Sequence, residues 1–228
     1  MKLRDWDDLP KFMRQDEVKE YYEVLKGHEC GLLLKRLTDV VLAALMLLLL
    51  SPVMLLVAVA IKLDSRGPVI FKQVRVTQYG RKFFIWKFRT MVQDAERLGS
   101  QVTVSGDARL TRVGKFIRDF RIDEFPQLVN VLRGEMSFVG TRPEVVKYVK
   151  GYTKEMRATL LLPAGITSRA SICYKDEGEL LKDAVDVDEA YIREVLPEKM
   201  GYNLEDLRHF SYGRELMTMV DTVLAVLR

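Results

Sequence analysis

The sequence predicts an α+β protein that is mostly helical, with one small β-hairpin and one membrane segment. An unbroken run without a charged side chain covers residues 40–61. Two strand-like segments, at residues 69–76 and 82–88, flank a turn at Tyr79-Gly80. In most of the remaining chain, apolar residues recur three or four positions apart, which is typical of amphipathic helices.

Residues 1–34 are predicted to be a polar N-terminal extension with one helix at residues 16–26, which Gly27 ends. Cys30 and Cys173 lack metal-ligand spacing, so we expect free thiols in a reducing cytoplasm. The helix carries its apolar residues on one face: Val18, Tyr21, Tyr22 and Leu25.

Residues 35–64 are predicted to be the membrane segment. Their apolar run has the length that crosses a bilayer as a helix. Pro52 removes a backbone donor at its midpoint and disfavours a straight helix. The run begins too late and is too long for a cleaved signal peptide, so we expect it to remain in the mature protein.

Cations flank the apolar run on both sides, and positive charge favours the cytoplasmic side of a membrane. One arrangement is a hairpin that enters one leaflet, breaks at Ser51-Pro52 and returns. A spanning helix with a proline kink fits the run equally well. A buried core helix fits less well, because such helices are rarely so long and uniformly apolar. The flanking cations are Lys35, Arg36, Lys62 and Arg66.

Residues 65–228 are predicted to form a cytoplasmic domain that begins with the β-hairpin. A polar loop is expected at residues 99–107. The last predicted helix is amphipathic, and either the membrane interface or the soluble core can cover its apolar stripe. Helices are predicted at residues 90–98, 110–120, 125–132, 145–162, 184–196 and 216–227.

The chain has 228 residues and a formal net charge of +4. This charge suits an anionic membrane surface or a phosphate-bearing ligand. A nucleic-acid surface on the basic helix would need interleaved aromatic residues. Only Phe116 and Phe120 fit that pattern, and both are better explained as core residues, so we expect no nucleic acid partner.

Asp123 and Glu124 are the main candidates for chemistry. Arg118 and Arg121 lie just upstream, and a loop shaped by glycine and proline follows at residues 140–144. Carboxylates beside arginines can hold Mg²⁺ together with phosphates. An aspartate can also form a covalent phosphoryl intermediate. The alternative is a helix-start preference, since the macrodipole favours acidic residues there.

Lys87 and Arg89 form a second basic cluster, where a predicted strand meets a predicted helix. Both could bind a diphosphate. The alternative is a solvated surface on which their aliphatic stems pack against the sheet.

Several further blocks, in this order, give a specific family resemblance over residues 35–172. The chain resembles the bacterial sugar transferases of the monotopic polyprenol-phosphate phosphoglycosyl transferase class. The matching blocks are Lys35-Arg36-x-x-Asp39, Ser51-Pro52, Gly67-Pro68 to Gln73, Lys87-Phe88-Arg89-Thr90-Met91, Asp107-x-Arg109-x-Thr111, Asp123-Glu124-Phe125-Pro126-Gln127, Gly134 to Glu144, and Ala164-Gly165-Ile166-Thr167.

The resemblance implies transfer of a sugar 1-phosphate from a UDP-sugar to a polyprenol phosphate such as undecaprenyl phosphate. The products would be a polyprenyl-diphosphate sugar and UMP, in a first step of glycoconjugate or polysaccharide assembly. It also implies Mg²⁺ dependence and a re-entrant membrane hairpin broken at Ser51 and Pro52. The catalytic domain would face the cytoplasm at the bacterial inner membrane, with amphipathic helices at the interface.

The resemblance also implies roles for individual residues. Asp123 would be the nucleophile and a Mg²⁺ contact, and its attack would give a phosphosugar-aspartyl enzyme. Glu124 would act as a base toward the polyprenol phosphate or as a contact for metal and substrate. Arg118 would reach the phosphate, and Lys87 and Arg142 match basic positions near the site.

Some residues depart from the usual family pattern. Thr141 stands where the family usually has proline, and so does Ala164. The chain looks like a short form of the family. The sugar stays open, and so does the oligomeric state, with a homodimer as one option. The rival hypothesis is a membrane-anchored scaffold without activity, which would not need this concentration of Asp, Glu and Arg residues.

Overall fold

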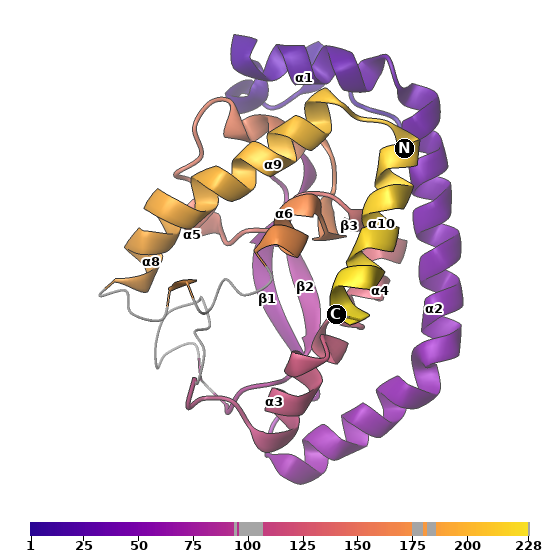
Figure 1. Ribbon diagram of the computed structural model, residues 1–228, viewed down its shortest axis with the longest axis vertical. Helices are drawn as coiled ribbons and strands as arrows, with labels where there is room; N and C mark the ends of the chain where they lie inside the picture. The colour runs from indigo at the N-terminus through magenta and orange to yellow at the C-terminus, as the bar shows by residue number, and fades with distance from the viewer. Residues whose placement is uncertain (94, 96–106, 175–179, 182–185, 228) are drawn as a thin grey trace.

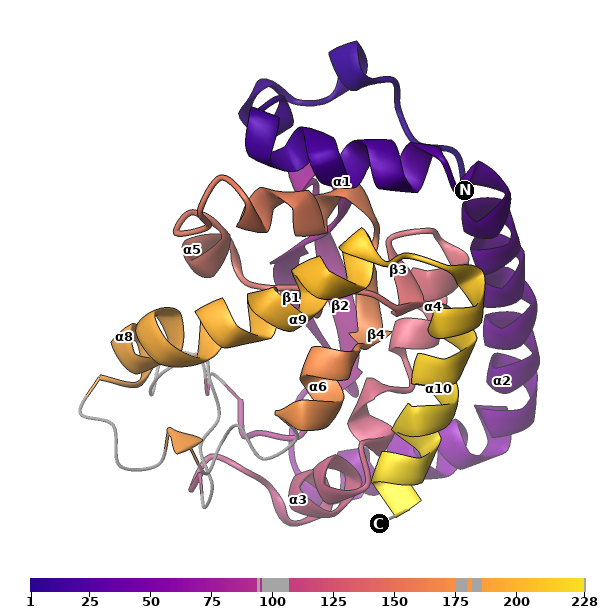
Figure 2. The same ribbon diagram turned by 45° about the horizontal axis from the view of Figure 1, so that its top comes forward.

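The computed structural model describes residues 1–93, 95, 107–174, 180–181 and 186–227. Helices surround two small β-elements, which confirms the mostly helical fold with a small hairpin (Figures 1 and 2). The strands are β1 (Ile70–Val76), β2 (Lys82–Phe88), β3 (Met136–Val139) and β4 (Ala164–Thr167). The α-helices are α1 (Asp16–Lys26), α2 (Glu29–Asp64), α3 (Arg112–Asp119), α4 (Gln127–Leu132), α5 (Val146–Val149), α6 (Arg169–Cys173), α8 (Val187–Ala190), α9 (Leu196–Arg208) and α10 (Tyr212–Leu227).

The predicted hairpin is present as the antiparallel pair β1–β2. Side chains alternate between its two faces, with Phe83 and Ile85 buried and Phe84 exposed. A second, parallel pair joins β3 to β4, which the sequence did not predict. Every residue of β3 is buried, so this strand lacks the alternation that would reveal it.

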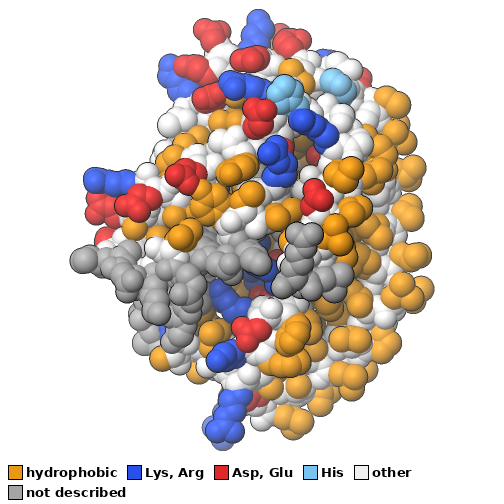
Figure 3. All heavy atoms as spheres, in the orientation of Figure 1, with side chains coloured by type: hydrophobic (Ala, Val, Ile, Leu, Met, Phe, Trp, Pro, Cys, Tyr) orange, Lys and Arg blue, Asp and Glu red, His pale blue; other side chains and the backbone are white. Residues whose placement is uncertain are grey.

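The apolar run lies inside α2, one helix of 36 residues that is long and apolar enough to cross a membrane. Figure 1 shows it running along one edge of the molecule and bending toward α3. Figure 3 shows hydrophobic side chains gathered along that edge. Its exposed large side chains are Leu33, Leu34, Leu37, Val40, Val41, Leu45, Leu48, Leu49, Val53, Leu55, Leu56, Val59 and Leu63.

The helix is continuous through Ser51 and Pro52. A residue at position 52 would normally donate its backbone N–H to the carbonyl of Leu48, four positions earlier. Proline has no such donor. The Ser51 hydroxyl donates to that carbonyl instead, at 2.8 Å, so the bend leaves no unpaired acceptor there.

Both ends of α2 are fastened to the same folded domain. Near its N-terminus, the Arg36 guanidinium donates to the carbonyls of Val131 (2.7 Å) and Leu132 (2.9 Å) in α4. At its C-terminus, the Asp64 carboxylate accepts a 3.1 Å hydrogen bond from the backbone of Val113 in α3. The helix is therefore held to one domain at both ends, and side chains along its middle, including Met46, Leu50 and Met54, pack against that domain as well.

The N-terminal segment belongs to the main core. Helix α1 has the predicted bounds, and the side chains of Leu3, Leu9 and Met13 are buried in the same cluster as residues of α9. The Tyr21 hydroxyl adds a 2.6 Å hydrogen bond to Glu155.

The predicted helix at residues 145–162 is wrong. Helix α5 ends at Val149, and a 3₁₀ segment covers Met156–Leu161. Gly151 weakens a helix at this point. The Thr153 hydroxyl accepts a hydrogen bond from the backbone of Met156, which starts the second segment separately.

The helix predicted at residues 184–196 does not end at residue 196, because the chain stays helical from Val187 to Arg208. A π-helical turn, Tyr191–Val195, joins α8 to α9, and Pro197 stands in the first turn of α9, where proline is tolerated. Residues 182–185 lie outside the described part.

The predicted helix at residues 90–98 is absent over residues 90–93, where Met91 pairs with Leu110 in an isolated β-bridge. The rest of that helix lies outside the described residues, apart from residue 95. So does the predicted loop, up to residue 106.

Candidate functional site

A left-handed turn places the two candidate carboxylates. After α3, Arg121 adopts φ 54° and ψ 20°, a conformation that is uncommon for a residue other than glycine. The 3₁₀ segment Ile122–Glu124 follows and packs against β2 and α3. Asp123 and Glu124 are thereby buried, at 6% and 9% exposure.

Glu124 is held by two cations from different elements. Lys87 Nζ in β2 and an Arg142 guanidinium nitrogen both donate to Glu124 Oε1, at 2.9 Å and 2.7 Å. Burial opposes ionisation of this carboxyl group, but Arg142 and Lys87 outweigh it and hold the pKa of Glu124 well below its usual range. Glu124 is therefore a fixed anion.

Asp123 has the opposite environment. Burial raises its pKa, and the neighbouring Glu124 charge raises it further, against the opposing effects of Lys87, Arg118 and Arg142. No hydrogen bond reaches its carboxylate from the residues that the structure describes. Arg118 in α3 is a nearby cation, and burial lowers its own pKa. Asp123 thus carries a carboxylate whose charge the protein only partly compensates.

Two glycines fix the loop that carries Arg142. The backbones of Gly140 and Gly165 approach so closely that a Cβ on Gly165 would lie 2.2 Å from Gly140 N. Gly165 N donates to the Thr141 carbonyl at 2.9 Å. Residues 140–144 are therefore bound to β4 through the backbone.

The structure thus brings together five of the predicted site residues. Asp123 and Glu124 lie beside cations from three elements: Arg118 from α3, Lys87 from β2 and Arg142 from the loop after β3. Ser51 and Pro52 lie in the middle of α2, at its predicted break, although the helix is continuous there.

Arg89 is placed differently from the other cations. Its guanidinium donates to the carbonyls of Ser65 (2.7 Å) and Arg66 (2.8 Å) and to the Ser65 hydroxyl (2.9 Å). These contacts end α2 and fasten it to the hairpin. A role of Arg89 in substrate binding stays a prediction.

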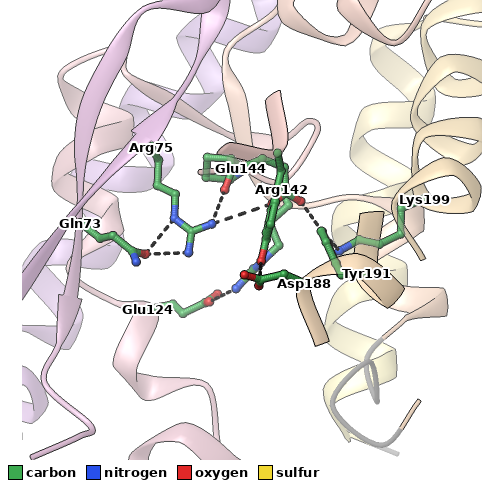
Figure 4. Close-up of polar contacts among 10 residues, drawn as sticks. Gln73, Arg75, Glu124, Arg142, Glu144, Asp188, Tyr191 and Lys199 are labelled. Carbon is green, nitrogen blue, oxygen red and sulfur yellow. Dashed lines mark hydrogen bonds and ion pairs between the residues drawn. The ribbon is translucent and has the colours of Figure 1, made fainter. Parts of the chain in front are cut away.

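Sequence reasoning missed a buried polar network next to this site (Figure 4). It joins Arg75 of β1 and Glu144 of the Arg142 loop to Tyr191 and Lys199, which lie more than 45 residues later in the chain. Of these four residues, only Glu144 lies in a block of the family resemblance that ends near the site, Gly134 to Glu144, so it alone could have indicated the network from the sequence. Tyr191 and Lys199 belong to no motif.

The residues at the site fit a divalent cation. Mg²⁺ is usually held by one or two carboxylates together with substrate phosphates and water. Asp123 is a buried carboxylate that accepts no hydrogen bond from the described residues, and it is therefore open to such an ion. Within the described part of the chain, no group of three His, Cys, Asp or Glu side chains could form a cage made of protein ligands alone.

Comparison with known proteins gives the family. A profile of the bacterial sugar transferase family matches residues 30–228. The chain is 37% identical over 197 residues to the UDP-N-acetylgalactosamine-undecaprenyl-phosphate N-acetylgalactosaminephosphotransferase of Aeromonas hydrophila. The matched stretch covers 85% of this chain and 44% of that protein.

Two further relatives are named UDP-glucose:undecaprenyl-phosphate glucose-1-phosphate transferase. The protein of Escherichia coli (strain K12) is 43% identical over 170 residues, covering 71% of this chain and 36% of that protein. The protein of Caulobacter vibrioides is 40% identical over 166 residues, covering 70% of this chain and 62% of that protein. The chain thus spans less than two thirds of the length of each of these three relatives. With the family profile matching most of its length, the chain belongs to the bacterial sugar transferases.

Proposed function

We propose that this chain transfers a sugar 1-phosphate from a UDP-sugar to undecaprenyl phosphate, giving an undecaprenyl-diphosphate sugar and UMP. The observation that carries the proposal is the buried pair Asp123 and Glu124 among cations from three elements. A diphosphate brings negative charge that such cations can bind. The names of the relatives supply the substrate class.

In the first half-reaction, an Asp123 oxygen attacks the β-phosphorus of the UDP-sugar. A new P–O bond forms to Asp123, and the bond between the β-phosphorus and the oxygen bridging to the α-phosphate breaks. That oxygen keeps the electron pair and leaves with UMP. Arg118 and Lys87 stabilise the charge that develops on the phosphoryl oxygens. The enzyme then carries a phosphosugar-aspartyl group.

In the second half-reaction, a phosphate oxygen of the polyprenol phosphate attacks the same phosphorus. The bond to Asp123 breaks, and the carboxylate is regenerated. Glu124 assists here, either by accepting the proton of a monoprotonated acceptor or by orienting the cations. Its two hydrogen bonds from Lys87 and Arg142 keep it in place and ionised, and a carboxylate with so low a pKa is a weak base, which favours the orienting role.

Mg²⁺ belongs to this proposal as the cofactor. Asp123 would hold it together with oxygens of the diphosphate. When bound, Mg²⁺ neutralises diphosphate charge and stabilises the leaving phosphate. The protein's own contribution is to keep Asp123 buried, close to Arg118 and, among the described residues, free of competing hydrogen bonds.

We also propose that α2 is re-entrant, with both ends on the cytoplasmic side of the inner membrane. Arg36 and Asp64, near opposite ends of α2, are both bound to the one domain that carries Asp123. A spanning helix would have to carry one of these ends across the bilayer. Phe116 and Phe120, on and beside α3, are exposed, so their predicted place in the core is wrong. Because α3 contacts α2, two exposed aromatic rings there support a membrane surface on this side.

The proposal is tested by mixing the purified protein with a panel of UDP-sugars and Mg²⁺, with and without undecaprenyl phosphate. We expect UMP release with at least one sugar, and a phosphosugar adduct on Asp123 when the lipid is omitted. Release of UMP only with the lipid, and no adduct, would replace the two-step mechanism by direct transfer and reassign Asp123 to binding Mg²⁺. No UMP with any sugar would favour the scaffold.

A further inference from the structure

The Arg142 loop is braced from the side by a chain of buried side chains, shown in Figure 4. Lys199 Nζ donates to the Tyr191 hydroxyl at 3.1 Å, and that hydroxyl donates to Glu144 Oε1 at 2.5 Å. The Glu144 carboxylate faces the Arg75 guanidinium at 3.9 Å. The Tyr191 hydroxyl thus links the Lys199 cation to the Glu144 anion, which in turn faces the Arg75 cation.

Arg75 passes the constraint to the loop backbone. Its guanidinium donates to the Pro143 carbonyl at 3.2 Å, directly after Arg142. Arg75 Nε and Nη2 donate to Gln73 Oε1, at 2.9 Å and 2.6 Å, so the guanidinium cannot rotate freely. The backbone of Val76 also donates to the Glu144 carbonyl at 3.0 Å.

The network is buried, which makes each contact consequential. Tyr191, Lys199 and Glu144 are 2%, 4% and 5% exposed. A buried carboxylate that loses a hydrogen-bond donor keeps its desolvation cost, so the surrounding loop has to rearrange.

We propose that Tyr191, supported by Lys199, is a positioning residue for the phosphoryl transfer. It acts through Glu144 and Arg75 on residues 141–144, and so keeps Arg142 against Glu124. This inference rests on the proposed function for its kinetic readout. It assigns a task in the reaction to the helix that follows residue 186, far in sequence from the carboxylates.

The test compares Tyr191→Phe with Tyr148→Phe. The two tyrosines are both 2% exposed and stack on each other with ring centroids 4.9 Å apart. The Tyr148 hydroxyl donates to Asp188 at 2.6 Å and not to Glu144. Both variants therefore keep the ring. Tyr191→Phe loses the hydrogen bonds to Glu144 and from Lys199, whereas Tyr148→Phe loses the one to Asp188, so only Tyr191→Phe changes the brace.

Two readouts are taken on the full-length protein in lipid nanodiscs. The first is amide hydrogen exchange at Val76 and Gly165, whose N–H groups donate to the carbonyls of Glu144 and Thr141. We expect exchange about tenfold faster in Tyr191→Phe, the equivalent of one lost hydrogen bond, and unchanged in Tyr148→Phe. The second is UMP release from the UDP-sugar, with kcat and KM measured separately.

We expect Tyr191→Phe to lower kcat about tenfold and to leave KM unchanged, because Arg118 lies outside the brace. Lys199→Met should cause a smaller loss in the same direction. Equal losses in Tyr191→Phe and Tyr148→Phe, or exchange at Val76 and Gly165 that does not respond to Tyr191→Phe, would overturn the inference. If the wild-type protein releases no UMP, the proposed function fails, and hydrogen exchange alone decides whether Tyr191 braces the loop.

Discussion

Asp123 and Glu124 are adjacent in the chain, yet the pKa values of their carboxyl groups are shifted in opposite directions. Burial raises the pKa of Asp123, whereas Arg142 and Lys87 lower the pKa of Glu124. A pair of titratable groups separated in this way usually divides two chemical tasks between them. The partly compensated Asp123 suits the nucleophile, and the fixed anion Glu124 suits a partner that keeps its charge throughout.

The first prediction concerns these two carboxylates. Asp123→Asn should reduce UMP release by a factor on the order of 10⁴, because a neutral amide replaces the attacking carboxylate. Glu124→Gln should still release UMP in the absence of lipid but should be impaired in transfer to undecaprenyl phosphate. Single-turnover measurements of the two half-reactions check this. Turnover by Asp123→Asn at near wild-type rate would remove Asp123 from the nucleophile role.

The second prediction concerns stability and pH in Mg²⁺-free buffer. A raised pKa in the folded state means that ionising Asp123 costs stability as pH rises from its ordinary value of 3.8 through the folded value. Asp123→Asn should therefore be more stable than the wild type at pH 7, and the difference should close on acidification. Thermal unfolding in detergent across pH measures it, and a less stable variant at pH 7 would contradict the assignment.

The third prediction uses two arginines of α3 as a matched pair. The Arg118 cation lowers the pKa of Asp123, whereas Arg112 is exposed in the first turn of the same helix. Arg118→Ala should raise KM for the UDP-sugar about tenfold or more, as expected for a lost charge-assisted contact to phosphate. Arg112→Ala makes the same charge change and should leave KM at its wild-type value. Equal effects of the two would point to a general loss of positive charge.

The fourth prediction concerns the topology of α2. Cys30 and Cys173 are exposed thiols on either side of its apolar run, so Cys30→Ser and Cys173→Ser provide single-thiol reporters. A membrane-impermeant maleimide should reach both from the cytoplasmic side. Pro52→Ala restores the missing donor and should shift some molecules to a spanning form. Labelling of the two wild-type thiols from opposite sides would rule out the hairpin.

The fifth prediction concerns α10. Its Glu215 pairs with Lys35 of α2, while Val220 and Val223 are exposed on another face. Val223→Asp should weaken binding to anionic vesicles about tenfold, because an apolar contact with lipid is lost. Gly213→Asp adds the same charge where a side chain would meet nothing within 4 Å, and should bind as the wild type does. Loss of folding in Val223→Asp would instead make α10 a core helix.

The sequence predicted the elements whose signal is local. The hairpin, α1 and α4 follow from alternation or helical spacing over a few residues, and the run inside α2 follows from composition. Strands β3 and β4 were missed because each has only four residues and neither alternates between buried and exposed positions: β3 is buried throughout, and β4 is buried in its first half and half-buried in its second. The predicted helix at residues 145–162 was wrong because the prediction followed the helical spacing of the apolar residues and gave too little weight to Gly151, which weakens a helix.

The candidate site divides in the same way. Arg118, Asp123 and Glu124 lie within seven positions and could be grouped from the sequence. Arg142 and Lys87 join them only through the fold, and the family resemblance anticipated that. Tyr191 and Lys199 could not be found, because a buried hydroxyl and a buried ammonium become informative only when the helix carrying them packs against Glu144.

The hydrogen bond from the Ser51 hydroxyl to the Leu48 carbonyl has an evolutionary consequence. Proline at position 52 without a hydroxyl at position 51 would leave that carbonyl without a donor, which is costly if α2 enters the hydrocarbon layer as proposed. The hydroxyl without the proline would compete with a restored amide for the same carbonyl. The two positions should therefore be inherited as a unit. Threonine is the substitution that position 51 should accept in descendants that keep the proline, and lineages that lose one of the two residues should lose the other.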